Sequence, residues 1–399
     1  MIEGYDIICF SGDWDGDPLS KKHIMLRLAR RNRVLWVNSL GNRRPTASTR
    51  DLKRIWKKIQ EFAGGCREVA PNLHVYAPLA LPFYGNRLAR ALNKRFLAWH
   101  LRRTYRKLGF RNPLTWSFIP SSADIAGVLG ESLVIYHCVD EFSEFTGTDK
   151  RAIRHMERRL MQKADAVITS SAPLLEDKRR YNANAFLVTH GVEVEHFRKA
   201  CDAATVVPED IAHLPKPVIG FYGLIADWVD LGLVRRLAQA RPEWSFVLIG
   251  KSDTDLDVVQ GLPNVHILGR REYTDLPAYC KGFDVAILPF VDNILTRAAN
   301  PLKLREYLAA GLPVVTTDLP ETRRLQEWLR FGRTEEDYLA AITAILASGR
   351  SGPQREISLA MDRESWDEKV EEMSRIVERL ERARRPSAAA TAVAEVVTP

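Results

Sequence analysis

The sequence lacks several features that would place it among membrane, secreted or redox proteins. No apolar run reaches the about 18 residues that a membrane-spanning helix needs. The first residues have no basic segment followed by an apolar stretch, so we expect no signal peptide. No GxGxxG pattern opens a strand–helix unit, which argues against a dinucleotide oxidoreductase. The five cysteines have neither metal-binding nor CxxC spacing, so we expect reduced thiols and a cytoplasmic protein.

The composition is that of a globular protein with unevenly distributed charge. Hydrophobic residues make up 46% and charged residues 27% of the 399 residues, which excludes a mainly disordered or fibrous chain. The net charge is +8, yet residues 1–200 carry 34 Lys or Arg against 20 Asp or Glu, whereas the remainder is slightly acidic. A basic first half suits an anionic surface or a phosphorylated substrate, although a solvated basic face explains the charge equally well.

Two successive series of apolar strands and amphipathic helices predict the fold class. Near-continuous apolar runs are typical of parallel strands that are covered on both faces. We therefore expect an α/β protein with two Rossmann-like, doubly wound parallel-sheet domains that face a cleft. The expected strands are residues 5–11, 34–38, 113–119, 133–139, 165–170 and 185–189 in the first series, and 218–222, 245–249, 265–268, 284–289 and 312–317 in the second.

Changes in composition along the chain predict the domain boundaries. Periodicity is weak around residues 199–216, and the last residues are rich in Ala, Thr and Val. The expected units are a first domain over 1–200, a linker over 201–216, a second domain over 217–364, a closing helix over 365–385 and a disordered tail over 386–399.

Residues 300–318 carry the most chemical information. Asn300 and Pro301 suit the start of a helix. Lys303 and Arg305 would then lie in its first turns, where the helix dipole disfavours cations unless an anion binds there. Glu306, three residues beyond Lys303, can accept two hydrogen bonds from a vicinal diol such as a ribose. From these residues alone, an ordinary helix with a Lys303–Glu306 ion pair is a comparable interpretation.

The pattern Pro301-x-Lys303-x-x-Glu306-Tyr307-x-Ala309-x-Gly311-x-Pro313 resembles the donor-nucleotide motif of GT-B glycosyltransferases. It is most similar to the retaining bacterial group 1 transferases of teichuronic-acid, capsule and exopolysaccharide synthesis. Motifs in the expected order extend the resemblance over most of the chain: Gly220-Phe-Tyr-Gly223, Asn264 to Arg271, His190-Gly-Val-Glu-Val-Glu-His-Phe197 and Ser365-Trp366.

The resemblance implies a GT-B architecture, with acceptor binding in the first domain and nucleotide-sugar binding in the second. It implies that Glu306 binds the ribose and Lys303 the diphosphate of the donor. The resemblance also places Asn300, Leu302 and Gly223 at the donor site, and the loop at residues 269–272 near the nucleotide base.

Two departures from the family pattern affect the donor site. Ala298 stands eight positions before Glu306, where the family has an acidic residue that contacts the donor sugar. The basic pair that follows the turn at Gly223 in the family is also absent. We therefore expect Arg297, Lys303 and Arg270 to contact the phosphates.

The first half offers three candidates for the chemical step. His137 matches a histidine that touches the donor sugar in related transferases, although the residues alone favour a core histidine. Asp140 follows the same expected strand, and Asp13 lies in the loop Ser11-Gly-Asp-Trp-Asp-Gly16. Either carboxylate can orient or deprotonate an acceptor hydroxyl. The structural alternatives are a helix cap for Asp140 and a turn-forming residue for Asp13.

The expected reaction uses no cofactor and no metal, because no Asp-x-Asp pair lies in a loop suited to a metal-bound diphosphate. Basic side chains and a helix dipole would stabilise the departing diphosphate instead. The expected partners are a UDP- or GDP-linked sugar donor and a glycan or lipid-linked acceptor. We expect a retaining enzyme from the resemblance, although the residues leave the stereochemistry, the sugar and the linkage open.

Residues 53–107 are strongly basic, with only Glu61 and Glu68 as acids and with interleaved aromatics. The part from Arg87 to Phe110 predicts a basic amphipathic helix, which suits peripheral contact with an anionic membrane at the inner face of the plasma membrane. A solvated helix is the alternative, and no nucleic-acid module is present.

Two other functions fit a fold of this kind. The absence of the first carboxylate at Ala298 leaves open a non-catalytic scaffold that binds a nucleotide sugar or a glycan. A sugar-nucleotide epimerase needs acid and base groups around the sugar, and the same lack of a carboxylate counts against it.

Overall fold

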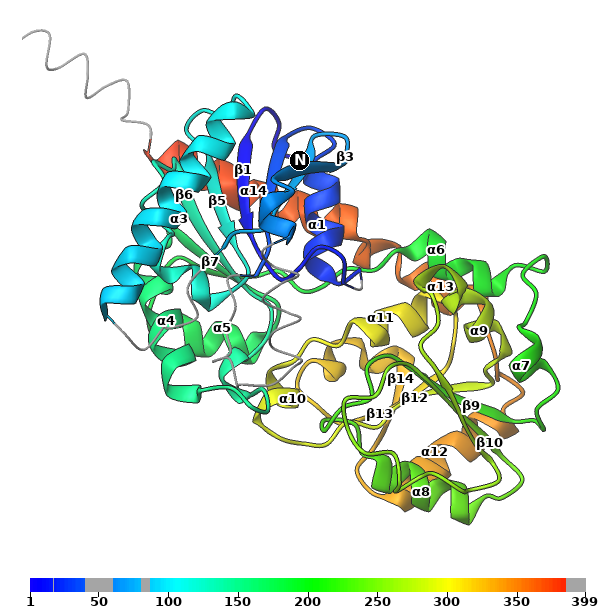
Figure 1. The fold of residues 1–399 in the computed structure, drawn as a ribbon. Helices are drawn as coiled ribbons and strands as arrows, with labels where there is room; N and C mark the ends of the chain where they lie inside the picture. The colour runs from blue at the N-terminus through cyan, green and yellow to red at the C-terminus, as the bar shows by residue number, and fades with distance from the viewer. Residues whose placement is uncertain (17, 40–59, 80–86, 385–399) are drawn as a thin grey trace, which may run out of the picture.

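The computed structural model describes residues 1–16, 18–39, 60–79 and 87–384, which form two α/β domains (Figure 1). The two doubly wound sheets expected from the sequence are confirmed. The tail expected to be disordered, residues 386–399, lies outside the described residues, as does part of the basic segment. Within the described residues, no helix is both long enough and apolar enough to cross a bilayer.

The first domain is built on an eight-stranded sheet in the order β3-β4-β2-β1-β5-β6-β7-β8. All neighbouring strands run parallel except β3 and β4, which are antiparallel. The strands are β1 (Asp6–Phe10), β2 (Arg33–Val37), β3 (Cys66–Ala70), β4 (Leu73–Tyr76), β5 (Leu114–Ser117), β6 (Leu133–Cys138), β7 (Ala166–Thr169) and β8 (Ala185–Leu187). The helices around it are α1 (Ser20–Leu28), α3 (Arg87–Lys107), α4 (Lys150–Lys163), α5 (Ala172–Lys178) and α14 (Trp366–Arg384).

The second domain contains a fully parallel six-stranded sheet in the order β11-β10-β9-β12-β13-β14. Its strands are β9 (Val218–Tyr222), β10 (Ser245–Ile249), β11 (Val265–Gly269), β12 (Val285–Leu288), β13 (Val314–Thr317) and β14 (Leu329–Gly332). Its helices are α6 (Val194–Arg198), α7 (Glu209–Ala212), α8 (Leu231–Ala240), α9 (Leu276–Gly282), α10 (Ile294–Ala298), α11 (Leu302–Ala309), α12 (Glu335–Ala347) and α13 (Arg355–Ala360).

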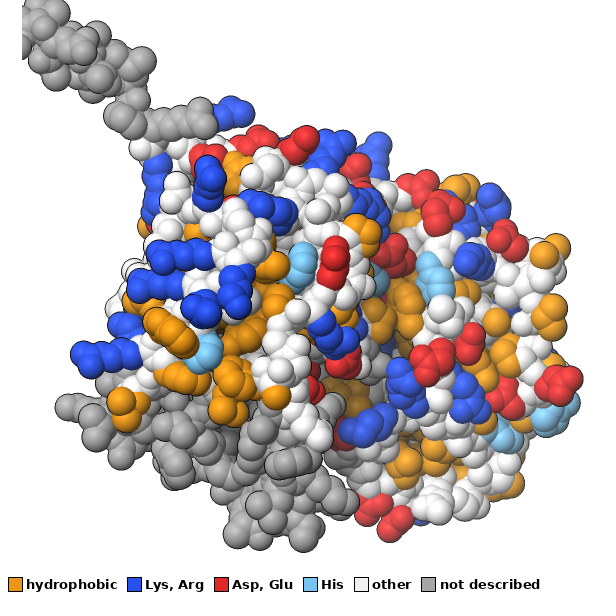
Figure 2. Space-filling model, turned by 45° about the horizontal axis from the view of Figure 1, so that its top comes forward, with side chains coloured by type: hydrophobic (Ala, Val, Ile, Leu, Met, Phe, Trp, Pro, Cys, Tyr) orange, Lys and Arg blue, Asp and Glu red, His pale blue; other side chains and the backbone are white. Residues whose placement is uncertain are grey.

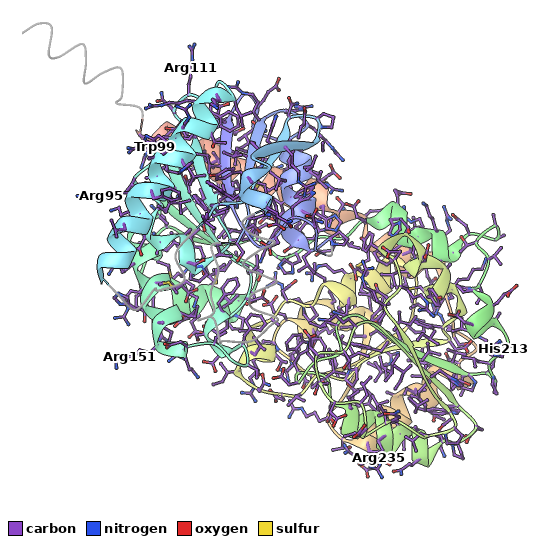
Figure 3. The ribbon with its side chains drawn as sticks, viewed as in Figure 1. Arg95, Trp99, Arg111, Arg151, His213 and Arg235 are labelled. Atoms are coloured by element: carbon purple, nitrogen blue, oxygen red, sulfur yellow. The ribbon has the colours of Figure 1, made fainter. Side chains whose placement is uncertain are left out.

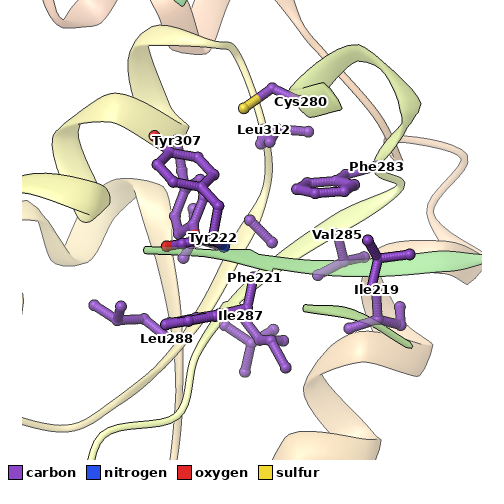
Figure 4. Packing of buried hydrophobic residues seen from close by; sticks show 14 of the residues in the cluster. Ile219, Phe221, Tyr222, Cys280, Phe283, Val285, Ile287, Leu288, Tyr307 and Leu312 are labelled. Atoms are coloured by element: carbon purple, nitrogen blue, oxygen red, sulfur yellow. Dashed lines mark hydrogen bonds between the residues drawn. The ribbon is translucent and has the colours of Figure 1, made fainter. Parts of the chain in front are cut away.

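Close packing explains why the central strand β9 contains a glycine. Figure 4 shows the apolar side chains that surround this strand, with Phe283 on one side of it. A Cβ atom at Gly220 would lie 2.1 Å from the Phe283 ring, so the ring occupies the space of the missing side chain. All five residues of β9 are buried, as expected for a strand covered on both faces.

Three strands were missing from the expectation, namely β3, β4 and β14. Two of them, β3 and β14, are edge strands of four or five residues with polar side chains among their apolar ones. Strand β4 has four residues and lies within the basic segment, whose charges obscure its apolar alternation. Short strands of this kind gain their stability from pairing with a neighbour, which local periodicity does not reveal.

The chain crosses between the domains earlier than residue 200, the expected boundary. Val192, Val194 and Phe197 already belong to the core of the second domain. Ile211 and Leu214 pack in the same core, so residues 201–216 are part of the second domain rather than a separate linker. The buried apolar side chains in this stretch, Ile211 and Leu214, are too few to show a helical or strand period.

Helix α14 closes the structure by returning to the first domain. Trp366, Val370, Met373 and Val377 on this helix lie in the core of the first domain. The chain therefore passes between the domains twice, near Val192 and near Glu364. These two segments lie side by side, because the Val192 N–H donates to the Glu364 carbonyl at 2.9 Å. A Cβ atom at residue 191 would lie 2.8 Å from the Trp366 backbone, so a glycine is required at this contact.

Replacing Trp366 by Ala should lower the free energy of unfolding of the first domain by about 3–5 kcal/mol, because it leaves a cavity in a filled core. Differential scanning calorimetry on the whole chain measures this. Glu368→Ala, an exposed change on the same helix, should cost less than about 0.5 kcal/mol. Equal losses in the two variants would contradict the packing role of Trp366.

Candidate functional site

The second sheet reverses its strand order between β9 and β12, and helix α11 lies next to the end of β9. Ligands of doubly wound sheets bind beyond the carboxyl ends of the strands at such a reversal. The Tyr222 hydroxyl at the end of β9 donates to Glu306 at 2.9 Å. The Tyr222 backbone N–H donates to the Tyr307 hydroxyl at 2.8 Å. These two bonds attach the first turns of α11 directly to the place where a ligand is expected.

Lys303 lies over the turn that follows β9. A Cβ atom at Gly223 would lie 1.6 Å from Cε of Lys303, and Gly223 has a φ of 130°, so a glycine is required beneath the lysine. The structure therefore brings Lys303 to Gly223 and places Glu306 on the same helix, so three of the residues expected at the donor site lie close together. The Lys303 ammonium is half-buried and makes no hydrogen bond or ion pair with the described residues, so it is available to an anion.

Burial sets the electrostatics of this pair. Burial lowers the pKa of Lys303 and raises the pKa of Glu306, and each partner's charge offsets part of the other's shift. The hydrogen bond from Tyr222 also favours the Glu306 carboxylate. An anionic ligand beside Lys303 would favour its charged form, and no carboxylate among the described residues forms an ion pair with this lysine.

Asn300 lies behind this site rather than at the helix cap. Pro301 occupies the N-cap position of α11 and makes no side-chain cap, so the prediction that Asn300 caps the helix is wrong. Asn300 is buried: its amide N–H donates to Glu321 at 2.6 Å, and its amide oxygen accepts from Arg305 at 2.8 Å. Arg305 also donates to Glu364 at 2.8 Å. The protein itself therefore balances the charge of Arg305, and no ligand is needed for it.

Leu302, Arg297 and Arg270 lie in different surroundings. Leu302 packs against the core of the first domain and so joins helix α11 to that domain. Arg297 on α10 is exposed and pairs with Asp292 at 2.5 Å. Arg270, after β11, pairs with Glu272 at 2.6 Å. The structure thus engages both arginines with surface carboxylates, and neither contacts Lys303.

His137 is a fully buried side chain near the end of β6. The Trp116 indole N–H donates to its Nδ1 at 3.4 Å, which assigns the proton of the neutral ring to Nε2. That Nε2 is buried and has no partner among the described residues. Burial, followed by the charges of His190 and Lys21, lowers the pKa of His137 well below its usual value. A neutral ring with an unsatisfied N–H is a hydrogen-bond donor for a ligand.

His190 joins the first domain to the segment that precedes α11. Its Nδ1 lies 3.0 Å from the Asn300 carbonyl and donates to it, which leaves Nε2 as a buried acceptor without a partner among the described residues. Burial, and then the charge of Arg305, lowers the pKa of His190 to about 3. The charge of His190 is among the causes that lower the pKa of His137. Each ring has a buried nitrogen without a partner among the described residues.

Asp140 follows β6 and is half-buried, with no hydrogen bond from the described residues to its carboxylate. Burial raises its pKa to about 6, although the Lys21 charge opposes the shift. The neighbouring Glu141 accepts from the buried Lys178 at 2.9 Å, which holds the loop in place. Asp140 therefore combines a fixed position with a pKa suited to proton exchange near neutral pH.

Lys21 connects these first-domain groups. It lies in the first turn of α1, and its charge acts on Asp140, Cys9, His137 and His190. Helix α1 begins at Ser20, with Leu19 rather than Ser20 in the N-cap position. Lys21 makes no hydrogen bond or ion pair within the described ranges, and burial lowers its pKa. Lys21 in the first domain and Lys303 in the second are therefore alike: each is a lysine in the first turn of a helix, and burial lowers the pKa of each.

Within the described residues, no hydrogen bond or ion pair joins Asp13 to Lys21, His137 or Asp140. It is exposed, and its carboxylate accepts the Ser39 backbone N–H at 3.2 Å. This bond, together with the Trp36 indole N–H that donates to the Gly12 carbonyl at 3.0 Å, holds the loop after β1. The turn-forming role considered for Asp13 matches this geometry.

Sequence reasoning missed Lys21 and His190 as site residues. Lys21 is a cation in the first turn of a helix, the same signal that singled out Lys303, but Asp13 rather than Lys21 is the candidate predicted from this part of the chain. His190 stands first in the motif that ends at Phe197, which was used only to place a domain end. Its unsatisfied nitrogen becomes visible only when its surroundings are known.

Comparison with known proteins agrees with this geometry. Residues 216–348 match the family model described as glycosyl transferases group 1. TuaH of Bacillus subtilis (strain 168), named as a teichuronic acid biosynthesis glycosyltransferase, is 29% identical over 265 residues. That alignment covers 60% of this chain and 64% of TuaH, so the chain spans less than two thirds of this relative.

Solved structures resemble the whole chain. Sucrose-phosphate synthase from Thermosynechococcus elongatus has a TM-score of 0.67 at 16% identity, covering 95% of this chain and 100% of that one. The starch synthase IV catalytic domain from Arabidopsis thaliana, bound to ADP and acarbose, has a TM-score of 0.63 at 9% identity, covering 95% and 99%. S. aureus TarM, in complex with UDP among other ligands, has a TM-score of 0.59 at 9% identity, covering 93% and 99%.

The chain has two Rossmann-like sheets, and it passes between their domains twice. Its structure is similar to these enzymes over almost its full length, so the fold is of the GT-B class. Within the second domain, residues 216–348 are similar to the group 1 glycosyl transferases, whose family model they match.

Asp140→Asn should stabilise the protein at neutral pH. The folded-state pKa of Asp140, about 6, lies above the usual 3.8, so its ionisation destabilises the fold above pH 6, and this cost disappears as the pH falls toward 4. The free energy of unfolding at pH 7.5 should rise by about 1–3 kcal/mol and the gain should shrink to about a third at pH 4.5. Urea denaturation at both pH values measures it. A gain that does not change with pH would contradict the assigned ionisation.

Proposed function

We propose that the chain is a glycosyltransferase that moves a sugar from a nucleotide-sugar donor to a glycan or lipid-linked acceptor. One observation carries this proposal. The Lys303 ammonium, which has no ion-pair partner among the described residues, lies with the Glu306 carboxylate at the Gly223 turn, where the second sheet reverses its strand order. The match to the group 1 glycosyl transferases supports it. The name of TuaH supports a role in a cell-surface polysaccharide or glycolipid.

The donor binds along the start of α11. Lys303 and the uncapped backbone N–H groups of the first turn bind the diphosphate, and Glu306 accepts two hydrogen bonds from the ribose hydroxyls. The base lies toward the loop after β11, where Arg270 is held by Glu272. We propose a UDP- or GDP-linked donor and no cofactor; UDP in the TarM structure and ADP in the starch synthase structure support a nucleoside diphosphate leaving group.

The transfer is retaining and metal-independent. The bond between the anomeric carbon and the donor phosphate breaks, the bond to the acceptor oxygen forms on the same face, and the acceptor proton passes to the leaving phosphate. Lys303 and the α11 dipole stabilise the departing diphosphate. The unsatisfied Nε2–H of His137 donates to the donor sugar, and Asp140 accepts a hydrogen bond from the acceptor hydroxyl and orients it. The enzyme works in the cytoplasm, at the inner membrane face.

Titration with UDP, GDP, ADP, CMP and dTDP tests the donor site. One nucleotide should bind selectively, and Lys303→Ala and Glu306→Ala should each weaken it by about 10- to 100-fold, because each removes charge-assisted hydrogen bonds. Isothermal titration calorimetry measures the dissociation constants. Arg235→Ala removes an exposed cation of the same domain and should leave binding unchanged. Binding that survives both site substitutions would reject the site.

Substitution of His137 in the first domain tests the chemical step separately from donor binding. His137→Ala should keep nucleotide affinity within about threefold and lower kcat by at least about 100-fold, because the lost donor acts on the sugar in the transition state. Turnover with radiolabelled donor measures kcat, and proton NMR of the product gives the anomeric configuration. An inverted product would assign Asp140 as a general base instead. Selective binding with no transfer or donor hydrolysis would favour a non-catalytic scaffold.

A further inference from the structure

Helix α3 carries a dense positive charge on the first domain. Its 21 residues include eight Lys or Arg and no Asp or Glu. A groove of about 820 Å³ runs along it, lined by Lys94, Arg95, Trp99, Arg102, Arg103 and Arg106. Arg95 and Arg106 make no ion pair with any residue that the structure describes. These charges are therefore not neutralised within the described part of the protein, and a partner of opposite charge is available to them.

The same face exposes large apolar side chains. Leu92 is 52%, Phe96 42% and Trp99 59% exposed. At 100° per residue, Leu92, Arg95, Trp99 and Arg106 fall on one stripe of the helix, whereas Leu97, Leu101 and Tyr105 point into the core. Figure 2 shows this mixture of hydrophobic and basic side chains on the left side of the first domain, and Figure 3 shows Arg95 projecting away from it.

The combination of basic and large apolar side chains on one helix face indicates contact with a bilayer rather than with water alone. A helix face that only meets water gains nothing from an exposed Trp, Phe and Leu in a row. An interfacial helix needs both groups, because aromatic side chains enter the headgroup region while Lys and Arg bind anionic headgroups. The acidic second half of the chain would be repelled from the same surface, which leaves the first domain facing the bilayer.

We propose that the exposed face of α3, formed by Leu92, Arg95, Trp99, Arg103 and Arg106, docks on a bilayer rich in anionic phospholipid. The helix lies in the headgroup plane, with Trp99 inserted and the arginines on the lipid phosphates. The first domain is thereby held at the membrane, where a lipid-linked acceptor resides. This surface is separate from the donor site, so docking does not depend on the proposed transfer.

Vesicle co-sedimentation of the full chain tests this surface. Wild type should bind vesicles containing phosphatidylglycerol and phosphatidylcholine, and should bind pure phosphatidylcholine vesicles weakly. Arg95→Glu/Arg106→Glu should reduce the apparent binding constant for the anionic vesicles by at least about 30-fold, since each basic residue near the surface contributes about one kcal/mol. Trp99→Ala should reduce it by about tenfold. Raised salt should weaken binding of wild type.

A matched control separates a local site from net charge. Arg235→Glu/Arg330→Glu changes two exposed cations of the second domain and alters the net charge equally. It should bind anionic vesicles within about threefold of wild type. Both double variants change exposed side chains, and unchanged melting temperatures confirm their folding. UDP and GDP titrations on the same samples report the donor site independently.

The following results would overturn the proposal. The first is wild type that does not bind the anionic vesicles. The second is an α3 variant that binds as well as its control. The third is binding to a soluble polyanion, such as a heparin oligosaccharide, without vesicle binding, which would make this face a polyanion site instead.

Discussion

The buried guanidinium of Arg305 holds the two domains in one arrangement. It is 2% exposed, and it binds Glu364 at the second crossing and Asn300 ahead of α11. Asn300 in turn binds Glu321, which also accepts the backbone N–H of Ala172 in the first domain at 2.7 Å. Removing one partner of a buried charged group costs about 3–5 kcal/mol, so this network strongly opposes any other arrangement.

This network decides which cations remain available to a ligand. Arg305 and Lys303 are two residues apart in the first turns of α11, yet one is fully paired and the other is unpaired among the described residues. The carboxylates near the crossing are used by Arg305, and the Glu306 carboxylate is held by Tyr222. An anion that binds here therefore meets a helix start and an unneutralised lysine together.

The interface has a similar arrangement on its two sides. Helix α1 brings Lys21 to the first-domain groups, and helix α11 brings Lys303 to the end of β9. The Lys21 charge is among the causes that lower the pKa of His137 and of His190, both of which burial keeps neutral. Each has a buried nitrogen without a partner among the described residues. Unsatisfied buried polar atoms are costly, and their clustering at one interface is typical of a site that a ligand completes. The basic face of α3 lies outside this interface, on the first domain.

The sequence by itself determined the two parallel sheets and the closing helix, and it made Lys303 and Glu306 candidates, whereas only the family resemblance selected His137. Apolar strands and first-turn cations leave a local pattern that can be read without a structure. Only the tertiary structure decided the early crossing at Val192, the enclosure of Asn300 and Arg305, and the addition of Lys21 and His190. Each of these depends on contacts between residues that are far apart in the sequence, such as Asn300 with His190. Burial and pairing at such distances are properties of the packed chain, and no local spacing encodes them.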